Sequence, residues 1–246
     1  MVCPQDLPSF DEQRSWWNAW VREFLGAPDA EALRRGDTAI NLLQSLALSE
    51  PRILEVGCGN GWLCEKLIEF GPVTGVDLAD EAIREAQHRV PRATFIAGDF
   101  CSVELPLSAF DVALTLETLS HVLDQPAFVS RFAAVLKPNG HLILLTQNRL
   151  VYSRRSDIAP QGAGQIRRWV TMAELQRMIR PHFDVVRAFT IQPRGHLGFL
   201  QVVNSRILNA ALLRVMSPRR LEALKERAGL GQTLVVLARR RAAPST

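Results

Sequence analysis

The chain has 246 residues, of which 47% are hydrophobic, and its formal net charge at pH 7 is +4. This length and apolar content fit one large folded domain and argue against a chain that is disordered as a whole. The charge balance is too mild to indicate nucleic-acid binding. The N-terminal residues do not form a signal peptide, and no apolar run reaches the length of a membrane span, so we expect a cytoplasmic protein without a membrane partner.

The cysteine pattern argues against a metal site. The four cysteines, Cys3, Cys58, Cys64 and Cys101, form no C-x-x-C pair and no Cys/His spacing typical of metal ligands. We therefore expect reduced thiols and no bound metal.

The first fifty residues carry two helical patterns. Trp16, Trp20 and Phe24 recur at helical spacing, and a second pattern runs from about 37 to 48. Two interpretations stay open for the tryptophans, and both could hold together. They pack in a core, or they form an aromatic lid in which Trp16 and Trp20 contact a substrate. We expect residues 1–50 to form a helical lid and 51–246 to form the main domain.

From Pro51 onward, strands alternate with helices, which predicts an α/β domain with a parallel sheet. A capping box, Thr171 with Glu174, predicts a further helix. An amphipathic pattern over Val203 to Val215 places a helix inside an insertion at about 192–232. The expected strands are 52–56, 73–77, 93–97, 110–115, 141–146, 184–191 and 233–238, and the expected helices between the earlier strands are 61–70, 80–89 and 125–136, with a turn at 137–140.

A glycine-rich turn follows the first strand. Gly57, Gly59 and Gly61 allow a sharp turn and close approach of a ligand to the backbone. A dinucleotide fingerprint would need glycine at position 62, where Trp62 stands. Glu55, two residues before the first glycine, would repel a pyrophosphate but could face a positively charged group. The turn therefore disfavours a nicotinamide dehydrogenase.

The ends of the next two strands complete a recognisable pattern. The second strand ends in Asp77, at the distance where a carboxylate can meet a ribose, and the third ends in Gly98-Asp99-Phe100. Together with the glycine turn, this pattern resembles the class I S-adenosylmethionine-dependent methyltransferases. The resemblance implies a Rossmann-like sheet, mostly parallel with one antiparallel strand, and S-adenosylmethionine as cofactor.

The same resemblance implies a role for each residue of the pattern. The turn Gly57-Cys58-Gly59 would pack against the methionine part of the cofactor, with Glu55 behind it and Gly61 completing the turn. Asp77 would accept hydrogen bonds from the ribose, and Leu78 would lie on the adenine. Asp99 would bind the adenine amino group, and the Phe100 backbone would contact a ring nitrogen.

The segment after the fourth strand, Leu114 to Asp124, matches the family region that borders both cofactor and acceptor. Glu117 is its candidate cofactor contact. The segment lacks the Asp/Asn-Pro-Pro-aromatic tetrad of enzymes that methylate nucleobase amines, and it has no nucleophilic cysteine. It looks more like the ubiquinone-type and small-molecule methyltransferases.

Two histidines are candidate general bases. His121 follows the fourth strand, and an unperturbed imidazole titrates near neutrality, so we expect a rate that rises with pH through that range. A structural or cofactor-binding role for His121 stays open. His196 is the second candidate, because the insertion could carry it over the site, but it could equally be an exposed loop histidine.

Polar residues after the fifth strand are candidates for binding the acceptor, because strand ends in open α/β sheets face the ligand crevice. A polar loop before the capped helix is the other candidate, since arginine and tryptophan suit anionic groups and ring faces. Ordinary helix-entry structure is the alternative for both. The candidates are Gln147, Asn148, Arg149 and Tyr152, and, in the loop, Arg167, Arg168 and Trp169.

These observations predict methyl transfer from S-adenosylmethionine to an oxygen, or next a nitrogen, of a small metabolite such as a quinone precursor, sugar or natural-product intermediate. The alternatives are an RNA methyltransferase, which the mild charge disfavours, and a non-catalytic S-adenosylmethionine-binding regulatory subunit. The insertion at 192–232 could cover the acceptor site or mediate a homodimer.

Overall fold

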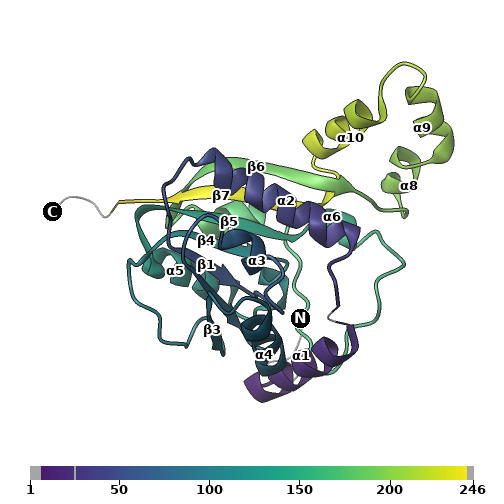
Figure 1. Ribbon diagram of the computed structural model, residues 1–246. Coiled ribbons are helices and arrows are strands. Elements are labelled where there is room, and N and C mark those ends of the chain that lie inside the picture. The colour runs from purple at the N-terminus through teal and green to yellow at the C-terminus, as the bar shows by residue number, and fades with distance from the viewer. Residues whose placement is uncertain (1–6, 25, 243–246) are drawn as a thin grey trace.

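The computed structural model describes residues 7–24 and 26–242, and its centre is a seven-stranded sheet with the strand order β3-β2-β1-β4-β5-β7-β6 (Figure 1). The expected strands all form, most of them within a few residues of their expected bounds. The strands are β1 (Ile53–Val56), β2 (Val73–Asp77), β3 (Thr94–Ala97), β4 (Phe110–Leu116), β5 (Leu136–Gln147), β6 (Phe183–Pro193) and β7 (Gly231–Arg240).

The pairing of the strands confirms a mostly parallel sheet with one antiparallel strand. β1 pairs with β2 and β4 in parallel, and β7 pairs with both β5 and β6 in antiparallel register. β5 and β6 therefore run in the same direction. The carboxyl ends of β1, β2, β4, β5 and β6 meet at one edge, and the strand order reverses between β1 and β4, where open sheets bind ligands.

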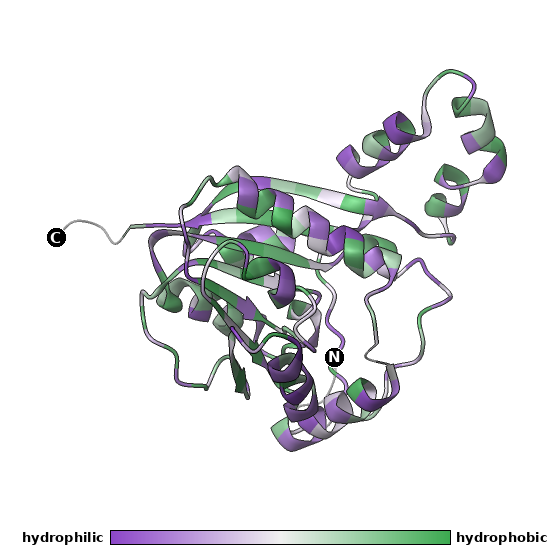
Figure 2. Cartoon of the chain, viewed as in Figure 1, coloured by the Kyte–Doolittle hydropathy of each residue, from purple (hydrophilic) through white to green (hydrophobic). Residues whose placement is uncertain are grey.

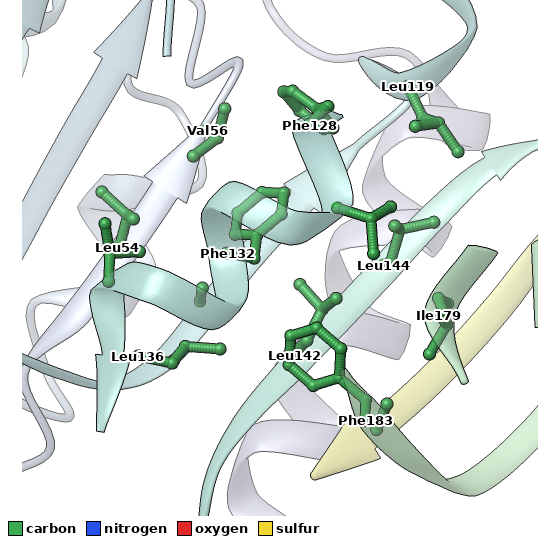
Figure 3. Packing of buried hydrophobic residues seen from close by; sticks show 14 of the residues in the cluster. Leu54, Val56, Leu119, Phe128, Phe132, Leu136, Leu142, Leu144, Ile179 and Phe183 are labelled. Carbon is green, nitrogen blue, oxygen red and sulfur yellow. The ribbon is translucent and has the colours of Figure 1, made fainter. Parts of the chain in front are cut away.

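Helices cover both faces of the sheet (Figure 1). On one face α2 contributes Ala39, Leu42 and Leu43 to a core with β1 and β4. On the other face α5 packs over β5 and α7 packs against β6, and Figure 3 shows Phe132 of α5 and Ile179 in the same cluster as Leu142 and Leu144. The helices on these layers are α2 (Ala30–Ser45), α3 (Cys64–Leu67), α4 (Asp80–Arg89), α5 (Gln125–Val135), α6 (Arg149–Tyr152) and α7 (Met172–Ile179).

The first fifty residues do not form one helical lid as expected, because only one of their two helices lies outside the core. α2 begins at Ala30, earlier than predicted, because the Asp29 side chain accepts a hydrogen bond from the Ala32 amide and caps the helix. Since α2 packs into the core, only α1 (Phe10–Phe24) is left to lie over the ligand edge.

Two other local expectations were wrong. The helix expected at 61–70 is one turn, α3, because Gly61 has a positive φ of 75° and belongs to the preceding turn. The turn expected at 137–140 is absorbed into β5, where Asn139 takes a φ of 64°. The capping box of Thr171 with Glu174 forms as predicted at the start of α7.

The insertion between β6 and β7 forms three short helices rather than one, and they project beyond the end of the sheet (Figure 1). The breaks arise because Ser205 and Ser217 cap new helices with their side chains. The helices are α8 (Phe199–Val203), α9 (Arg206–Leu212) and α10 (Pro218–Arg227). Across the described residues, each helix is too short or too polar to cross a membrane.

Candidate functional site

The glycine turn between β1 and α3 is shaped by its neighbours. Gly57 has a φ of 76°, and a Cβ there would lie 1.9 Å from the Thr118 hydroxyl oxygen. The Gly59 amide, with φ 52°, donates to Oδ2 of Asp77 over 2.8 Å. The turn therefore cannot take a side chain at Gly57, and the Asp77 carboxylate holds it to the end of β2.

Glu55 lies buried behind this turn. The Cys64 thiol donates to its Oε2 over 2.9 Å, and burial raises the pKa of Glu55 to about 8. The side chain is thus largely protonated at neutral pH, which differs from the negative charge that the sequence suggested there. The Cys58 side chain also points into the core, where burial raises its pKa to about 11, so Cys58 presents only its backbone to the turn.

The ends of β2 and β3 lie beside the turn. Oδ1 of Asp77 accepts the Ala79 amide over 2.9 Å, and burial raises the pKa of Asp77 while its backbone hydrogen bonds lower it. Leu78 and Asp99 are half-buried. The Phe100 ring packs against Phe128 in the core, so only the Phe100 backbone is available to a ligand.

His121 ends the short 3₁₀ helix η2 (Leu119–His121) after β4. Its Nδ1 lies 2.8 Å from the Ile166 carbonyl oxygen. A carbonyl only accepts, so Nδ1 carries the proton and Nε2 keeps its lone pair. Among the described residues, the hydrogen bond of the His121 ring is the one at Nδ1.

The environment of His121 changes its titration. Burial, together with the nearby Arg167 charge, lowers the pKa of His121 to about 4, although the hydrogen bond to the Ile166 carbonyl acts to raise it. The expectation of titration near neutrality was therefore wrong. His121 is a neutral imidazole over the whole physiological range.

Helix α1 reaches across the edge of the sheet to His121. The ring centroids of Trp17 and His121 lie 4.8 Å apart in an edge-on contact. Asn18 accepts the Glu81 amide over 3.2 Å, and Arg22 pairs with Glu81, which ties α1 to the start of α4. Helix α1 thus connects the region after Asp77 with η2.

The three tryptophans of α1 take different positions. Trp17 and Trp20 pack with Val21 against Ala79 and Ala82 at the start of α4. Trp16 lies instead against Gly162, where a Cβ would approach its indole nitrogen to 2.7 Å. Trp17, which the sequence analysis did not select, is the tryptophan in ring contact with His121.

The loop at 165–169 lies over η2. The Arg168 amide donates to the Ser120 carbonyl oxygen over 2.8 Å, and the Arg168 guanidinium donates to the Leu123 carbonyl. Arg167 donates to the Ala159 carbonyl and lies over the Trp169 ring. Both guanidinium groups therefore fasten the loop, which also supplies the Ile166 carbonyl to His121.

A second group of side chains surrounds Glu117 at the end of β4. Glu117 has a positive φ of 61°, and its Oε1 is buried without a hydrogen-bond partner in the described structure. Burial raises the pKa of Glu117, while the Arg35 charge and a hydrogen bond from Thr233 lower it. Burial and the Glu117 charge raise the pKa of Tyr152, whose ring packs against Trp169 with centroids 5.1 Å apart.

The residues after β5 bind mainly to the protein itself. Gln147 accepts the Ser120 hydroxyl over 2.6 Å. Asn148 donates to the Gly229 and Gly231 carbonyls and caps α6. Arg149 is exposed and pairs with Glu174. Of the four candidates from this segment, Tyr152 is therefore the one that lies beside Glu117.

His196 lies in the loop that enters the insertion. Its Nε2 accepts the Ser156 amide over 3.1 Å and lies 2.7 Å from the Ser156 hydroxyl, and the residue is exposed. These contacts join the insertion to the loop after α6. They do not involve η2 or the glycine turn.

Comparison with known proteins identifies the family of the chain. Residues 54–144 match the family model described as a methyltransferase domain. The chain is 36% identical over 193 residues to the ubiquinone biosynthesis O-methyltransferase of Idiomarina loihiensis, a match that covers 72% of this chain and 78% of that relative. The chain belongs to the class I S-adenosylmethionine-dependent methyltransferases.

Solved structures share the fold of this methyltransferase. An S-adenosylmethionine-dependent methyltransferase from Mesorhizobium loti matches with a TM-score of 0.59 and 21% identity over 82% of this chain and 98% of that chain. The 1,6-didemethyltoxoflavin-N1-methyltransferase of Burkholderia thailandensis, solved with bound S-adenosylhomocysteine, matches with a TM-score of 0.63 and 20% identity over 98% and 92% of the two chains.

S-adenosylmethionine is the cofactor of this methyltransferase, and the site fits it. The left-handed turn excludes a side chain at Gly57, and Asn60 beside it keeps a buried Oδ1 without a partner in the described chain. Sequence reasoning missed Trp17 and the Ile166 carbonyl. The spacing of Trp17, Trp20 and Val21 along one helix face could have identified the first, but a backbone acceptor leaves no sequence signal.

Proposed function

We propose that this methyltransferase methylates a hydroxyl oxygen of a small aromatic metabolite, with a phenolic quinone precursor as the first candidate acceptor. The observation that carries the proposal is the hydrogen bond from Nδ1 of His121 to the Ile166 carbonyl, which leaves Nε2 as a base at neutral pH. The O-methyltransferase relative from Idiomarina loihiensis supports the choice of oxygen and of a quinone precursor.

The cofactor side of the proposal uses the ends of β1, β2 and β3. Gly57, Gly59 and Gly61 would shape the turn against the methionine part, Asp77 would take the ribose hydroxyls, and Asp99 with the Phe100 backbone would take the adenine. Each carboxylate oxygen of Asp77 accepts one backbone amide and keeps further acceptor capacity for a hydroxyl. When bound, the cofactor supplies an electrophilic methyl group.

His121 would take the proton of the acceptor hydroxyl. As the acceptor oxygen bonded to the methyl carbon and the bond from that carbon to the cofactor sulfur broke, the hydroxyl proton would pass to Nε2, and S-adenosylhomocysteine would be the second product. The Nδ1 hydrogen bond would hold the ring in place. A base whose pKa is about 4 is weak, so it suits an acidic hydroxyl. A phenol or an enol therefore suits this base better than the alcohol of a sugar.

The acceptor would lie between helix α1 and the loop at 165–169. Trp17 contributes its ring beside His121, and Tyr152 and Trp169 form a ring pair at the end of the loop. Arg167 and Arg168 are engaged with backbone carbonyls, so they would position the loop and not bind an acidic group. An aromatic acceptor suits these walls better than a strongly charged one.

A nitrogen acceptor is the second candidate, and Glu117 favours it. Its buried Oε1 has no partner among the described residues and could accept an N–H donor from a bound amine. A phenolic hydroxyl could also donate to this oxygen, so Glu117 alone does not decide between the two acceptors.

A panel of acceptors tests the proposal. The purified protein is incubated with S-adenosylmethionine and, in parallel, with catechols, hydroxylated benzoquinols, sugars and aromatic amines, and products are identified by mass spectrometry. We expect O-methylated phenols at the highest kcat/KM. Faster methylation of the amines or the sugars would overturn the assignment to a phenolic oxygen.

A further inference from the structure

The positive charge of this chain is concentrated in the insertion at 192–232. This segment contains seven Lys and Arg but only two Asp and Glu, a net charge of +5, which leaves 22 Lys and Arg against 23 Asp and Glu elsewhere. The two acidic residues, Glu222 and Glu226, are both paired with Arg34 of α2. Five exposed arginines of the insertion have no carboxylate partner in the described part of the chain: Arg206, Arg214, Arg219, Arg220 and Arg227.

Several apolar side chains of the insertion are exposed. Ile207 is 86% exposed, Val215 is 78% exposed and Val202 is 65% exposed. Figure 2 shows hydrophobic residues on the helices that project from the domain. On α9 the polar Asn209 faces inward, where its side chain accepts a hydrogen bond from Lys225 over 2.9 Å. On this helix the apolar Ile207 is thus more exposed than the polar Asn209, which differs from a helix that packs its apolar residues on a core.

The insertion is held in a fixed position, so this exposure is a property of the fold. The Thr190 hydroxyl donates to the Glu226 carbonyl over 2.7 Å, and Glu226 also accepts the Gln192 amide over 3.0 Å. Leu200 and Leu221 are buried. Helix α10 is thereby fastened to β6, and α8 is anchored by Leu200, while Val202 of α8 and Ile207 of α9 remain exposed.

The insertion also lies at the ligand edge of the sheet. It leaves the carboxyl end of β6 at Pro193, and β6 runs in the same direction as β5 and β4. A partner surface that contacts α8 and α9 would therefore lie on the same side of the molecule as the proposed active site.

We propose that the 192–232 insertion binds the surface of a lipid bilayer that contains anionic lipids, with Ile207, Val215 and Val202 in the interface and the arginines on the headgroups. Unpaired basic residues beside exposed apolar ones are the combination that interfacial helices use. The proposal is independent of the acceptor, and it departs from the expectation of no membrane partner. A second copy of this chain is a less suitable partner for the insertion, because a twofold interface would place the same arginines opposite one another and their charges would repel.

Vesicle co-flotation tests this proposal with the full chain. Vesicles of phosphatidylcholine alone are compared with vesicles containing about 30% phosphatidylglycerol, at low and high salt. We expect binding to the anionic vesicles only, weakened by salt. Ile207→Ser with Val215→Ser should reduce the partition coefficient by about tenfold or more. Arg219→Gln with Arg220→Gln should reduce it by about fivefold per arginine.

Matched variants control for surface changes elsewhere. Leu107→Ser removes an apolar side chain that is 67% exposed outside the insertion, and Arg177→Gln with Arg180→Gln removes two exposed arginines of the α7 region. Both should bind vesicles like the wild type. Three results would overturn the proposal: no binding to anionic vesicles, equal loss in the control variants, or a preference for RNA. The proposal would also be overturned if the wild-type protein were a dimer that did not bind vesicles and the double variant Ile207→Ser with Val215→Ser were a monomer.

Discussion

The indole of Trp17 meets the imidazole of His121 edge-on, with ring centroids 4.8 Å apart and an interplanar angle of 81°. Trp17 comes from the first helix of the chain and His121 from the end of β4. The contact therefore couples the position of α1 to the residue that we propose as the base, and it helps to remove water from the imidazole.

Replacing Trp17 tests this coupling. Trp17→Ala should raise the pKa of His121 toward its usual range, because desolvation is the main cause of its depression. It should also lower kcat/KM by roughly twofold to tenfold, the scale of one aromatic contact. Trp16→Ala, which removes a ring packed on Gly162, serves as the control, and NMR titration of the imidazole gives the pKa. An unchanged His121 pKa in Trp17→Ala would contradict the coupling.

The pH dependence of the rate follows from the same pKa. His121 is neutral above a pKa of about 4, so the wild-type rate should stay flat from about pH 6 to 8 and fall only as the pH approaches 4. Measurement of kcat/KM across this range checks it, with His88→Gln as a control at an exposed histidine. A rate that rises steeply between pH 6 and 7.5 would show that another group titrates.

Glu55 should make the protein less stable at alkaline pH. Its pKa is about 8 in the folded state and about 4.5 when unfolded, so the folded state binds an extra proton between these values. Its stabilising contribution is present below about pH 4.5 and is lost as the pH rises through 8.

Glu55→Gln should remove this pH dependence. Wild type should lose about 2–3 kcal/mol of unfolding free energy relative to Glu55→Gln between pH 6 and 9. Denaturant unfolding at the two pH values measures the difference. Parallel pH profiles for the two proteins would show that Glu55 is ionised in the folded state.

Asp77 should govern cofactor affinity. Asp77→Ala removes the acceptor for the Gly59 amide and the proposed acceptor for the ribose, and it should weaken S-adenosylhomocysteine binding by roughly 1–3 kcal/mol. Titration calorimetry measures this, with Asp99→Ala as a second variant and Asp37→Ala on α2 as the control. Tighter binding of NAD than of S-adenosylhomocysteine by the wild type would contradict the cofactor assignment.

The sequence was sufficient for the parts of the fold that local signals specify. The glycine turn and Asp77 predicted where the first two strands end, because Gly57 needs a conformation that other residues avoid. The capping box at Thr171 predicted the start of α7 for the same kind of local reason. Helix α2 was assigned to the lid because its apolar spacing does not reveal which surface it covers.

The parts that the sequence did not reveal depend on tertiary contacts. The pKa of His121 is lowered by burial beneath α1 and the loop at 165–169, and neither contact has a signature near position 121. The apolar spacing of Ile207, Ala211 and Val215 was visible in the sequence. That these side chains face outward was not, because a periodic pattern does not distinguish a helix that packs on a core from one that presents its apolar face to a partner.

The most direct test of the account is the turnover of His121→Gln with a phenolic acceptor, measured together with S-adenosylhomocysteine affinity. If Nε2 of His121 is the base, kcat should fall by roughly 10²–10⁴-fold, the range of general base catalysis, while cofactor affinity stays within about twofold. Near-normal turnover, or loss of cofactor binding in place of turnover, would contradict the account.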